Sequence, residues 1–428
     1  MKKKIVELKE YDIIANQKLP GAIYLDNSSF KQLESLILTF NEEERTDAID
    51  FLTLTSKKNV GKIIRAKNYV GVLPLNNGVQ LQILPKIDGG TDDDSKKTFL
   101  KMLKTLRDFP SKSFNEANLN TEKMPIFEIF IRLYIKEVQQ LVKRGLKSSY
   151  YQIEDNLKVF KGKINFAQQT KHNMVHKERF FVQYDEYGLN RAENRLIKAT
   201  LEKLIKESES SENKKDLYRL LTHFESIESS SNIKKDFTEV KIDRNSKEYE
   251  APLNWSKIFL NSQSFTTFSG ASFVQSLLFP MDRVFEYYVG RNLKKILNPE
   301  EWAISLQDRQ YYLFEDKFAL RPDIVLQNKV KKQIVIIDTK WKVLMNSPAK
   351  NYGKSQADMY QMYAYGKKYG TNDIRLLYPI NKEFDVDQEI TFTSDDGVKV
   401  TIFFVDCHRI EASLNKFVNK LHQTSEPF

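Results

Sequence analysis

A short aliphatic run, Ile334-Val335-Ile336-Ile337, constrains the fold of this chain more than any other segment. Consecutive large aliphatic residues are typical of a strand that is covered on both faces, as in the centre of an α/β sheet. Apolar residues at helical spacing precede the run, from Pro280 to Ile296, and follow it at 355–369. Helices are therefore expected beside this strand, and the segment 269–428 is predicted to be an α/β domain.

The chain has 428 residues, which is too long for one ordinary core at roughly 150 residues per domain. Residues 1–100 are predicted to form a β-rich domain. Alternating segments at 69–75 and 79–87 flank Asn76-Asn77-Gly78, and an Asn-Gly pair in that setting is a strong hairpin signal. The glycines and acidic residues at 88–94 are expected to form the loop that ends this domain.

Residues 101–268 are predicted to be a central mixed helical region. A core helix is expected at 126–141 and an amphipathic helix at 194–205. Between them, a short strand pair is expected on either side of Lys161-Gly162-Lys163. The predicted fold class is thus α+β/α/β multidomain, with a β-rich domain, a helical region and a C-terminal α/β domain.

The net charge of +10 is concentrated in one part of this central region. Residues 101–180 carry 16 basic and 8 acidic side chains, whereas the rest of the chain is close to neutral. Basic segments of this kind bind nucleic acid or an acidic protein surface. The residues that we expect to touch DNA or a partner are Lys143, Arg144, Lys158, Lys161 and Lys163, and the sequence leaves open which of the two they meet.

The sequence predicts a cytoplasmic protein that does not enter a membrane. Its single cysteine, Cys407, cannot form an internal disulfide, and the basic start of the chain lacks the apolar stretch of a signal peptide. Its aliphatic runs are far shorter than the roughly 20 residues that cross a bilayer.

Two aspartates and a lysine form the most specific candidate site. Arg321-Pro322-Asp323 is expected to end one strand and Asp338-Thr339-Lys340 the next, with a hairpin between them. Two carboxylates at the same end of adjacent strands can hold Mg²⁺, and the strand period of two points Lys340 to the same side as Asp338. Phosphodiester hydrolysis needs this combination of metal and ammonium group. A strand that ends in Asp-x-Lys also occurs by chance.

Three further residues are candidates for the same site. Glu286, in the helix before the strands, could complete the metal ligands, or it could be a solvated helix charge. Gln361 and Tyr365 are four residues apart on the later helix and so share a face, from which they could position a phosphate, or they could be ordinary helix surface. By contrast, Gly353-Lys354-Ser355 lacks the earlier glycine and the leading strand of a nucleotide-binding loop, so this chain is not expected to bind a nucleoside triphosphate.

These residues resemble the McrC family, the nuclease subunit of McrBC-type restriction systems, which act on DNA containing 5-methylcytosine or on related targets. In the C-terminal part the resemblance rests on a PD-(D/E)xK pattern: Phe285-Glu286, Arg321-Pro322-Asp323, Asp338-Thr339-Lys340-Trp341-Lys342 and 358–365. Further forward it rests on Leu84-Pro85-Lys86-Ile87, Arg144-Gly145-Leu146, Phe160-Lys161-Gly162-Lys163, Tyr184-Asp185-Glu186 and 194–199.

The resemblance implies a restriction-endonuclease-like C-terminal domain that cuts both strands of foreign DNA with Mg²⁺. Asp323, Asp338 and Glu286 would be metal ligands, Lys340 would activate water, and Gln361 and Tyr365 would be catalytic residues that position phosphate. The implied partners are double-stranded DNA and a hexameric AAA+ GTPase of the McrB type. The front β-rich region would dock into the pore of that hexamer and stimulate GTP hydrolysis, with GTP bound by the partner. The resemblance also leaves open a homodimer that forms through the nuclease domain in the cleaving complex.

Two other functions stay open at this point. The chain could be an accessory protein that mainly activates and assembles the GTPase, with little nuclease activity. It could also be a RecB-like exonuclease that acts alone, because Gln361 and Tyr365 suit that group as well.

Overall fold

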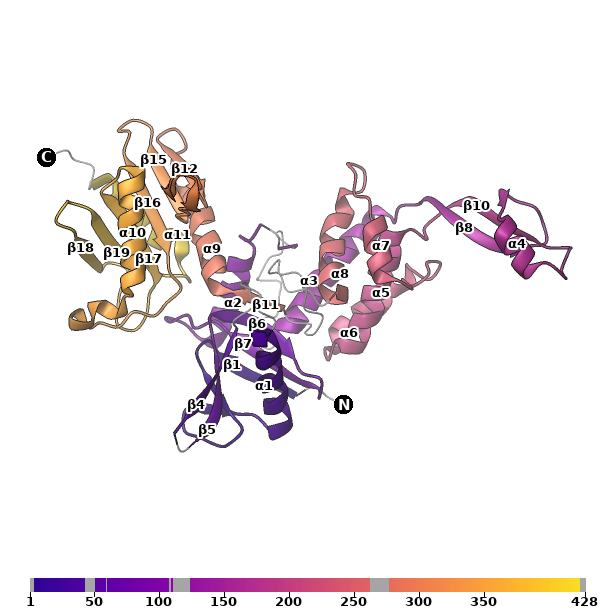
Figure 1. The fold of residues 1–428 in the computed structure, drawn as a ribbon, viewed down its shortest axis with the longest axis horizontal. Coiled ribbons are helices and arrows are strands. Elements are labelled where there is room, and N and C mark those ends of the chain that lie inside the picture. The colour runs from indigo at the N-terminus through magenta and orange to yellow at the C-terminus, as the bar shows by residue number, and fades with distance from the viewer. Residues whose placement is uncertain are drawn as a thin grey trace.

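The computed structural model describes residues 4–42, 51–58, 60–107, 109–110, 124–261 and 277–423. It is a mixed α/β structure with several sheets and an elongated shape (Figure 1). A β-rich body lies at the centre, a C-terminal α/β body lies on one side of it, and a helical body with a long arm lies on the other (Figure 1).

The β-rich body contains two four-stranded sheets with an apolar core between them. The predicted Asn-Gly hairpin is confirmed, because β6 and β7 pair antiparallel across it. One sheet has the order β1-β7-β6-β11, from Lys4–Lys9, Val79–Leu84, Tyr69–Pro74 and Leu277–Pro280. The other has the order β3-β2-β5-β4, from Ala22–Tyr24, Ile13–Ala15, Gly61–Ala66 and Leu52–Lys57, and α1 spans Asn27–Glu42.

The acidic segment at 88–94 is only partly a loop, so that prediction was wrong at its end. Helix α2 (Asp92–Leu103) begins within it. The Thr91 side chain accepts a hydrogen bond from the Asp94 backbone N–H, and the Asp94 carboxylate accepts one from the Thr91 backbone N–H. This capping box, together with three carboxylates in the first turn, stabilises the helix start.

The helical body confirms the two helices predicted for the central region. Helix α3 (Ile126–Arg144) follows Pro125 and buries its apolar side, and α5 (Ala192–Glu207) packs near it. In the described residues this body also contains the shorter helices α6 (Ser211–Thr222), α7 (Ile233–Glu239) and α8 (Glu250–Asn261). In the described residues, no helix is long and apolar enough to cross a membrane.

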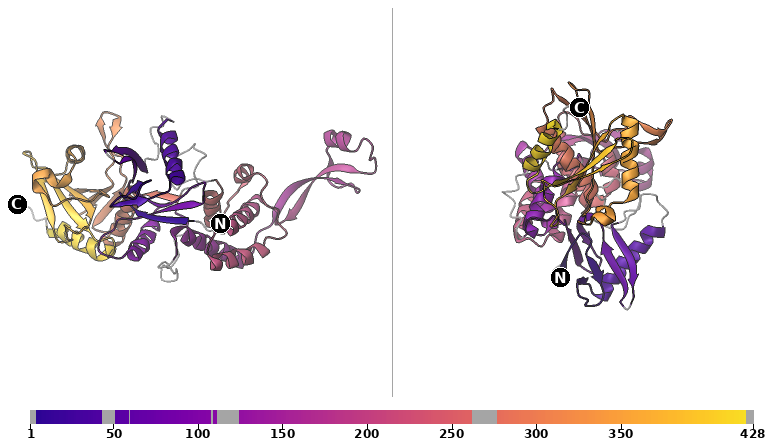
Figure 2. Two further views of the ribbon diagram at one scale, coloured as in Figure 1. Left: turned by 90° about the horizontal axis from the view of Figure 1, so that it is seen from below. Right: turned by 90° about the vertical axis from the view of Figure 1, so that its left-hand side faces the viewer.

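The arm is a hairpin that projects from the helical body (Figures 1 and 2). Its strands β8 (Ser149–Leu157) and β10 (Phe180–Gly188) pair antiparallel over their whole length. The far end carries the short strand β9 (Lys163–Ile164) and helix α4 (Phe166–His172).

The strand pair predicted around Lys161-Gly162-Lys163 is wrong, because β9 pairs with β10 and the segment 158–162 is not a strand. Gly162 has a φ of 72°, and a Cβ at this position would lie 2.3 Å from the Gln183 carbonyl oxygen. The chain therefore packs directly on β10 here, through a contact between residues that are far apart in the sequence.

The C-terminal body is built on a six-stranded sheet with the order β12-β15-β16-β17-β19-β18. The strands are Trp302–Leu306, Ile324–Asn328, Ile334–Thr339, Asp373–Pro379, Lys399–Val405 and Glu389–Thr393. A separate two-stranded sheet pairs β13 (Tyr312–Phe314) with β14 (Lys317–Ala319). Helices α9 (Met281–Ile296), α10 (Gln356–Tyr369) and α11 (Ile410–Gln423) surround the sheet, and a 3-10 segment spans Pro348–Gly353.

Strand β16 is covered on both faces, as the aliphatic run predicts. Val335 and Ile337 belong to the core that contains α9 and α11, while Ile336 belongs to the core that contains α10. Helix α10 begins after Ser355, whose hydroxyl accepts a hydrogen bond from the Asp358 backbone N–H, and it ends at Gly370 in the left-handed conformation. The covered strand predicted from this run is thus present, with helices beside it on both faces.

Candidate active site

Two aspartates meet at one end of the C-terminal sheet. β15 and β16 are antiparallel, and their register pairs Ile324 with Ile337. Asp323, the residue before β15, therefore lies near Asp338, which is close to the end of β16. Asp323 starts its strand and does not end it, so that detail of the prediction was wrong, while the meeting of the two carboxylates follows from the antiparallel pairing.

The Asp323 carboxylate is held by the neighbouring strand. Its Oδ2 accepts hydrogen bonds from the Thr339 backbone N–H and the Thr339 hydroxyl, each at 2.7 Å. Burial raises the pKa of Asp323, and the negative charge of Glu286 raises it further. Thr339 was not predicted as part of the site, although it lies between Asp338 and Lys340 in the sequence.

Asp338 is almost completely buried, with 2% of its surface exposed. Burial, together with the nearby Asp323 charge, raises the pKa of Asp338 to about 7. The Lys340 Nζ lies 2.7 Å from Asp338 Oδ2, so the two side chains share one side as the strand period predicts. Burial opposes the charged form of Lys340, but the Asp338 carboxylate outweighs this effect and raises the pKa of the ammonium group.

Glu286 approaches the same place from helix α9. Burial raises the pKa of Glu286, and the charge of Asp338 adds to this effect. Gln307 Nε2 donates a hydrogen bond of 2.5 Å to Glu286 Oε1. The Gln307 backbone N–H donates to the Asp323 carbonyl oxygen at 2.8 Å, so this residue ties Glu286 to the start of β15. Sequence reasoning missed Gln307, since it lies in a loop with no recognisable motif.

Gln361 and Tyr365 form a pair on α10, as their spacing predicts. Gln361 Nε2 donates to Tyr365 Oη at 2.8 Å, and Tyr365 is 1% exposed. Burial raises the pKa of Tyr365, and the charges of Asp338 and Asp323 contribute to this shift. The tyrosine thus lies beside the acid pair, and Gln361 reaches the site through it.

Lys354 is a second lysine near the site. Sequence reasoning did not assign it to the site, because it lies in Gly353-Lys354-Ser355, the segment that was rejected as a nucleotide-binding loop. Its Nζ hydrogen-bonds the Tyr378 hydroxyl and lies over the ring of that tyrosine. Burial lowers the pKa of Lys354 to about 7, and its charge interacts with Asp358, Lys340 and Asp338. A lysine in this segment could have been recognised only from its position in space.

The acidic residues suit Mg²⁺ by their chemistry, because carboxylate oxygens are the ligands that this ion prefers. Asp338 Oδ2 is buried and lies 2.7 Å from the Lys340 ammonium group. A bound cation would reduce the electrostatic repulsion among the Asp323, Asp338 and Glu286 carboxylates. However, in the described part of the chain, no three His, Cys, Asp or Glu side chains are already arranged as a metal site.

The predicted basic contact residues do not form one patch. Lys143 and Arg144 end α3, close to the root of the arm. Lys158, Lys161 and Lys163 lie beyond the nine residues of β8, roughly 30 Å further along at about 3.3 Å per residue. These are two separate basic positions, one at each end of the arm.

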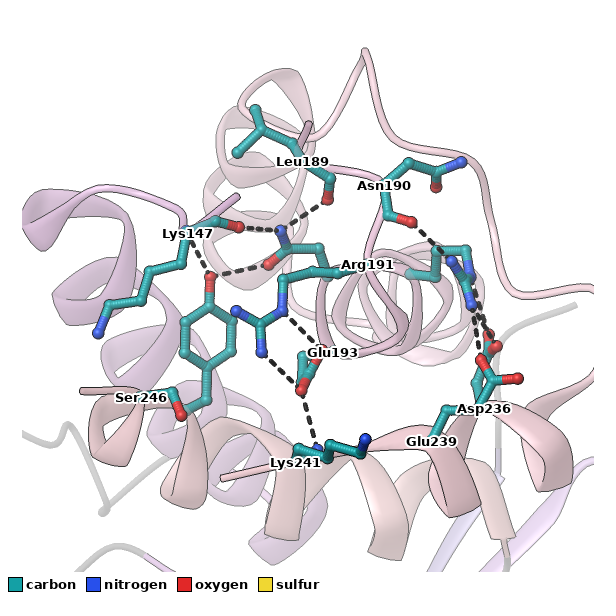
Figure 3. Close-up of polar contacts among 12 residues, drawn as sticks. Lys147, Leu189, Asn190, Arg191, Glu193, Asp236, Glu239, Lys241 and Ser246 are labelled. Carbon is teal, nitrogen blue, oxygen red and sulfur yellow. Dashed lines mark hydrogen bonds and ion pairs between the residues drawn. The ribbon is translucent and has the colours of Figure 1, made fainter. Parts of the chain in front are cut away.

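A buried polar network fixes the root of the arm to the helical body (Figure 3). Asn194 Nδ2 donates to the carbonyl oxygens of Lys147 and Leu189, which enter and leave the hairpin. Tyr249 Oη donates to Asn194 Oδ1 and accepts from the Lys147 backbone N–H, both at 2.9 Å. Beside this network, Arg191 forms a bidentate ion pair with Glu193.

The family model described as "McrBC 5-methylcytosine restriction system component" matches residues 64–379. The chain belongs to this family. The match begins in β5 and ends with β17, so it includes the arm, its root and the acid pair of this McrBC component. The resemblance noted from the sequence is therefore confirmed at the level of the family.

The fold is similar to that of a chain in the refined half-complex from the tetradecameric assembly of Thermococcus gammatolerans McrB AAA+ hexamers with bound McrC. The TM-score is 0.72 at 19% identity, and the match covers 98% of this McrBC component and 100% of that chain. A second match, to the T. gammatolerans McrBC complex, has a TM-score of 0.47 at 20% identity and covers 69% and 88%. A comparison with curated proteins finds no match.

Proposed function

We propose that this McrBC component is a Mg²⁺-dependent DNA endonuclease subunit that hydrolyses phosphodiester bonds in both strands of foreign DNA. The observation that carries the proposal is the meeting of Asp323 and Asp338 at one end of the sheet, with the Lys340 ammonium group 2.7 Å from Asp338. The elevated pKa of Asp338 supports a site made for a cation, since like charges are held close together there.

Asp323 and Asp338 would hold Mg²⁺, with Glu286 as an auxiliary ligand. When bound, the ion would neutralise the scissile phosphate and favour ionisation of water. Lys340 would orient the attacking water and offset negative charge in the transition state. Gln361 and Tyr365 would position the phosphate, and Thr339 would keep the Asp323 carboxylate in place through its two hydrogen bonds.

The test is cleavage of a covalently closed DNA circle by the complex reconstituted with an McrB-type partner. Asp338→Ala and Lys340→Ala should each abolish linearisation and leave DNA binding and partner GTP turnover intact. The matched controls are Asp385→Ala and Lys382→Ala, which remove exposed charges from the same body and should cut normally. Cutting by either active-site variant would refute the assignment, and cutting that requires a free DNA end would favour the exonuclease function.

We also propose that this chain binds and activates a hexameric AAA+ GTPase of the McrB type. Family membership supports this second activity, and the front β-rich region remains the docking surface predicted from the sequence. The arm is another candidate, because its far end exposes Phe166, Met174 and Val175 to 76%, 72% and 85%. Exposed apolar side chains gathered at the end of a projecting element are typical of a protein contact.

A further inference from the structure

A cleft lies beside the proposed active site, between the β-rich body and the end of the catalytic strand. It has a volume of about 630 Å³. Trp341 and Lys342, which directly follow Lys340, line one side, and residues of β4 and β5 line the other. The cleft is therefore adjacent to Lys340, the proposed catalytic lysine, along the chain.

One face of the β4–β5 pair supplies the groups that line the cleft. Thr53 is paired with Arg65 in the antiparallel register, and Thr55 lies two residues further along, so all three side chains share a face. Lys67 follows Arg65 by two residues and also lines the cleft. Threonine hydroxyl groups and the charged groups of arginine and lysine commonly bind the phosphates and sugars of DNA.

The charge of the cleft favours a polyanion. Arg65, Lys67 and Lys342 line it, against one acidic residue, Asp282. Lys342 already pairs with Asp358 at 3.2 Å. Arg65 is exposed, and its side chain has no hydrogen bond or ion pair with any residue that the structure describes, so its guanidinium group is available to a ligand.

The two walls of the cleft are joined by buried contacts. Glu10, at the end of the first strand, accepts hydrogen bonds from the Trp341 indole N–H at 2.9 and 3.1 Å. Asn68, just after β5, hydrogen-bonds Asp282 and accepts the Met281 backbone N–H at 2.8 Å. The β4–β5 face is thereby held next to the proposed catalytic segment.

We propose that this cleft binds the sugar-phosphate backbone of DNA next to the bond that is cut, with Arg65 contacting a phosphate. The inference rests on the proposed endonuclease function and adds a DNA-guiding role for the β-rich body. An acidic segment of a protein partner would also suit the charge. However, the position of the cleft beside Lys340 favours DNA, because the substrate backbone must continue past the reacting phosphate.

The test is the salt dependence of binding of a short DNA duplex to the full complex without divalent metal, so that no cleavage occurs. Arg65→Gln should weaken binding about 3- to 10-fold at moderate salt and reduce the slope of log K against log salt by about 0.9, the value for one phosphate contact. Arg65→Lys should retain most of the slope. The matched control is Lys62→Gln, which removes the same charge from the opposite face of β5, where Lys62 pairs with Glu34.

Unchanged DNA binding and slope in Arg65→Gln would overturn the proposal. So would a loss of partner GTP turnover with normal DNA binding, because the cleft would then be a protein contact. These outcomes are separate from failure of the proposed active site, which would appear as cutting by Asp338→Ala. An Arg65→Gln protein with wild-type thermal stability excludes misfolding as the cause of a weakened complex.

Discussion

The acidic residues of the candidate site depend on neutral neighbours for their positions. Thr339 holds Asp323 through two hydrogen bonds, and Gln307 holds Glu286 through one. Neither neighbour carries a charge, and each acts by donating hydrogen bonds to a carboxylate. Residues that hold metal ligands in this way are often as important as the ligands, because they set the orientation of the carboxylate.

We predict that Gln307→Met will weaken cleavage at limiting Mg²⁺, because Glu286 loses the hydrogen bond that holds its carboxylate in place. The variant keeps the length of the side chain but removes the amide that donates to Glu286. Cleavage should fall about 10- to 100-fold at limiting Mg²⁺ and recover in part as the Mg²⁺ concentration is raised. The matched control is Gln310→Met, an exposed glutamine three residues later. An unchanged Mg²⁺ titration in Gln307→Met would remove Gln307 from the site.

At the scale of elements, the arm is a long antiparallel hairpin whose root is held by hydrogen bonds and whose far end exposes both apolar and basic side chains. Asn194 and Tyr249 satisfy the backbone at both roots of the hairpin, so the arm is attached at two points and not by a single flexible strand. Leaving these part-buried backbone groups without partners costs up to about 1–3 kcal/mol each, which favours this one arrangement.

We predict that the double variant Phe166→Asp, Val175→Asp will lose stimulation of the McrB-type GTPase by about tenfold or more. Charged side chains in place of exposed apolar ones would have to be desolvated in the interface. Stimulated GTP turnover of the reconstituted partner is the measurement. Val330→Asp, at an exposed turn of the C-terminal body, is the control and should stimulate normally. Full stimulation by the double variant would leave the front β-rich region as the docking surface.

At the scale of the whole molecule, the β-rich body and the C-terminal body are coupled through buried polar contacts. Strand β11 pairs with β6 in the sheet of the β-rich body, and α9 of the C-terminal body follows it directly in the sequence. Glu10 is 1% exposed and accepts hydrogen bonds from both the Trp341 indole and the Lys86 backbone N–H. Burial is the main cause that raises the pKa of Glu10 from 4.5 to about 8.

This buried carboxyl group predicts a specific pH dependence of stability. Because the pKa is higher in the folded state, the folded protein binds this proton more tightly than the unfolded chain does. The stabilisation is complete below about pH 4.5 and is lost as the pH rises to about 8. The loss in the free energy of unfolding should be on the order of 5 kcal/mol.

Glu10→Gln should remove most of this loss, because glutamine is neutral at every pH. Chemical unfolding between pH 5.5 and 9 measures the difference between the variant and the parent protein. The control Glu411→Gln, at an exposed position, should follow the parent curve. If the curves for Glu10→Gln and the parent protein are parallel, Glu10 does not titrate between the folded and unfolded states.

Much of the local structure could be predicted from neighbouring residues. The Asn76-Asn77-Gly78 hairpin, the helix after Pro125 and the helix between Ser355 and Gly370 all form as expected, because turn and cap chemistry acts over a few residues. The errors fall where distant segments meet. β9 pairs with β10 and not with the segment just before it, and the start of β15 is set by its pairing with β16.

The sequence by itself determined the family, the covered strand β16 and the spacing that brings Asp323, Asp338 and Lys340 together, since a hairpin and the strand period are local properties. Only the tertiary structure decided that Gln307 and Lys354 join this site, that Glu10 connects the two bodies, and that Arg65 faces the cleft next to Lys340. These relations depend on how the β-rich body packs against the C-terminal body. Such packing arises from buried contacts between residues that are up to 331 positions apart, which no local pattern records.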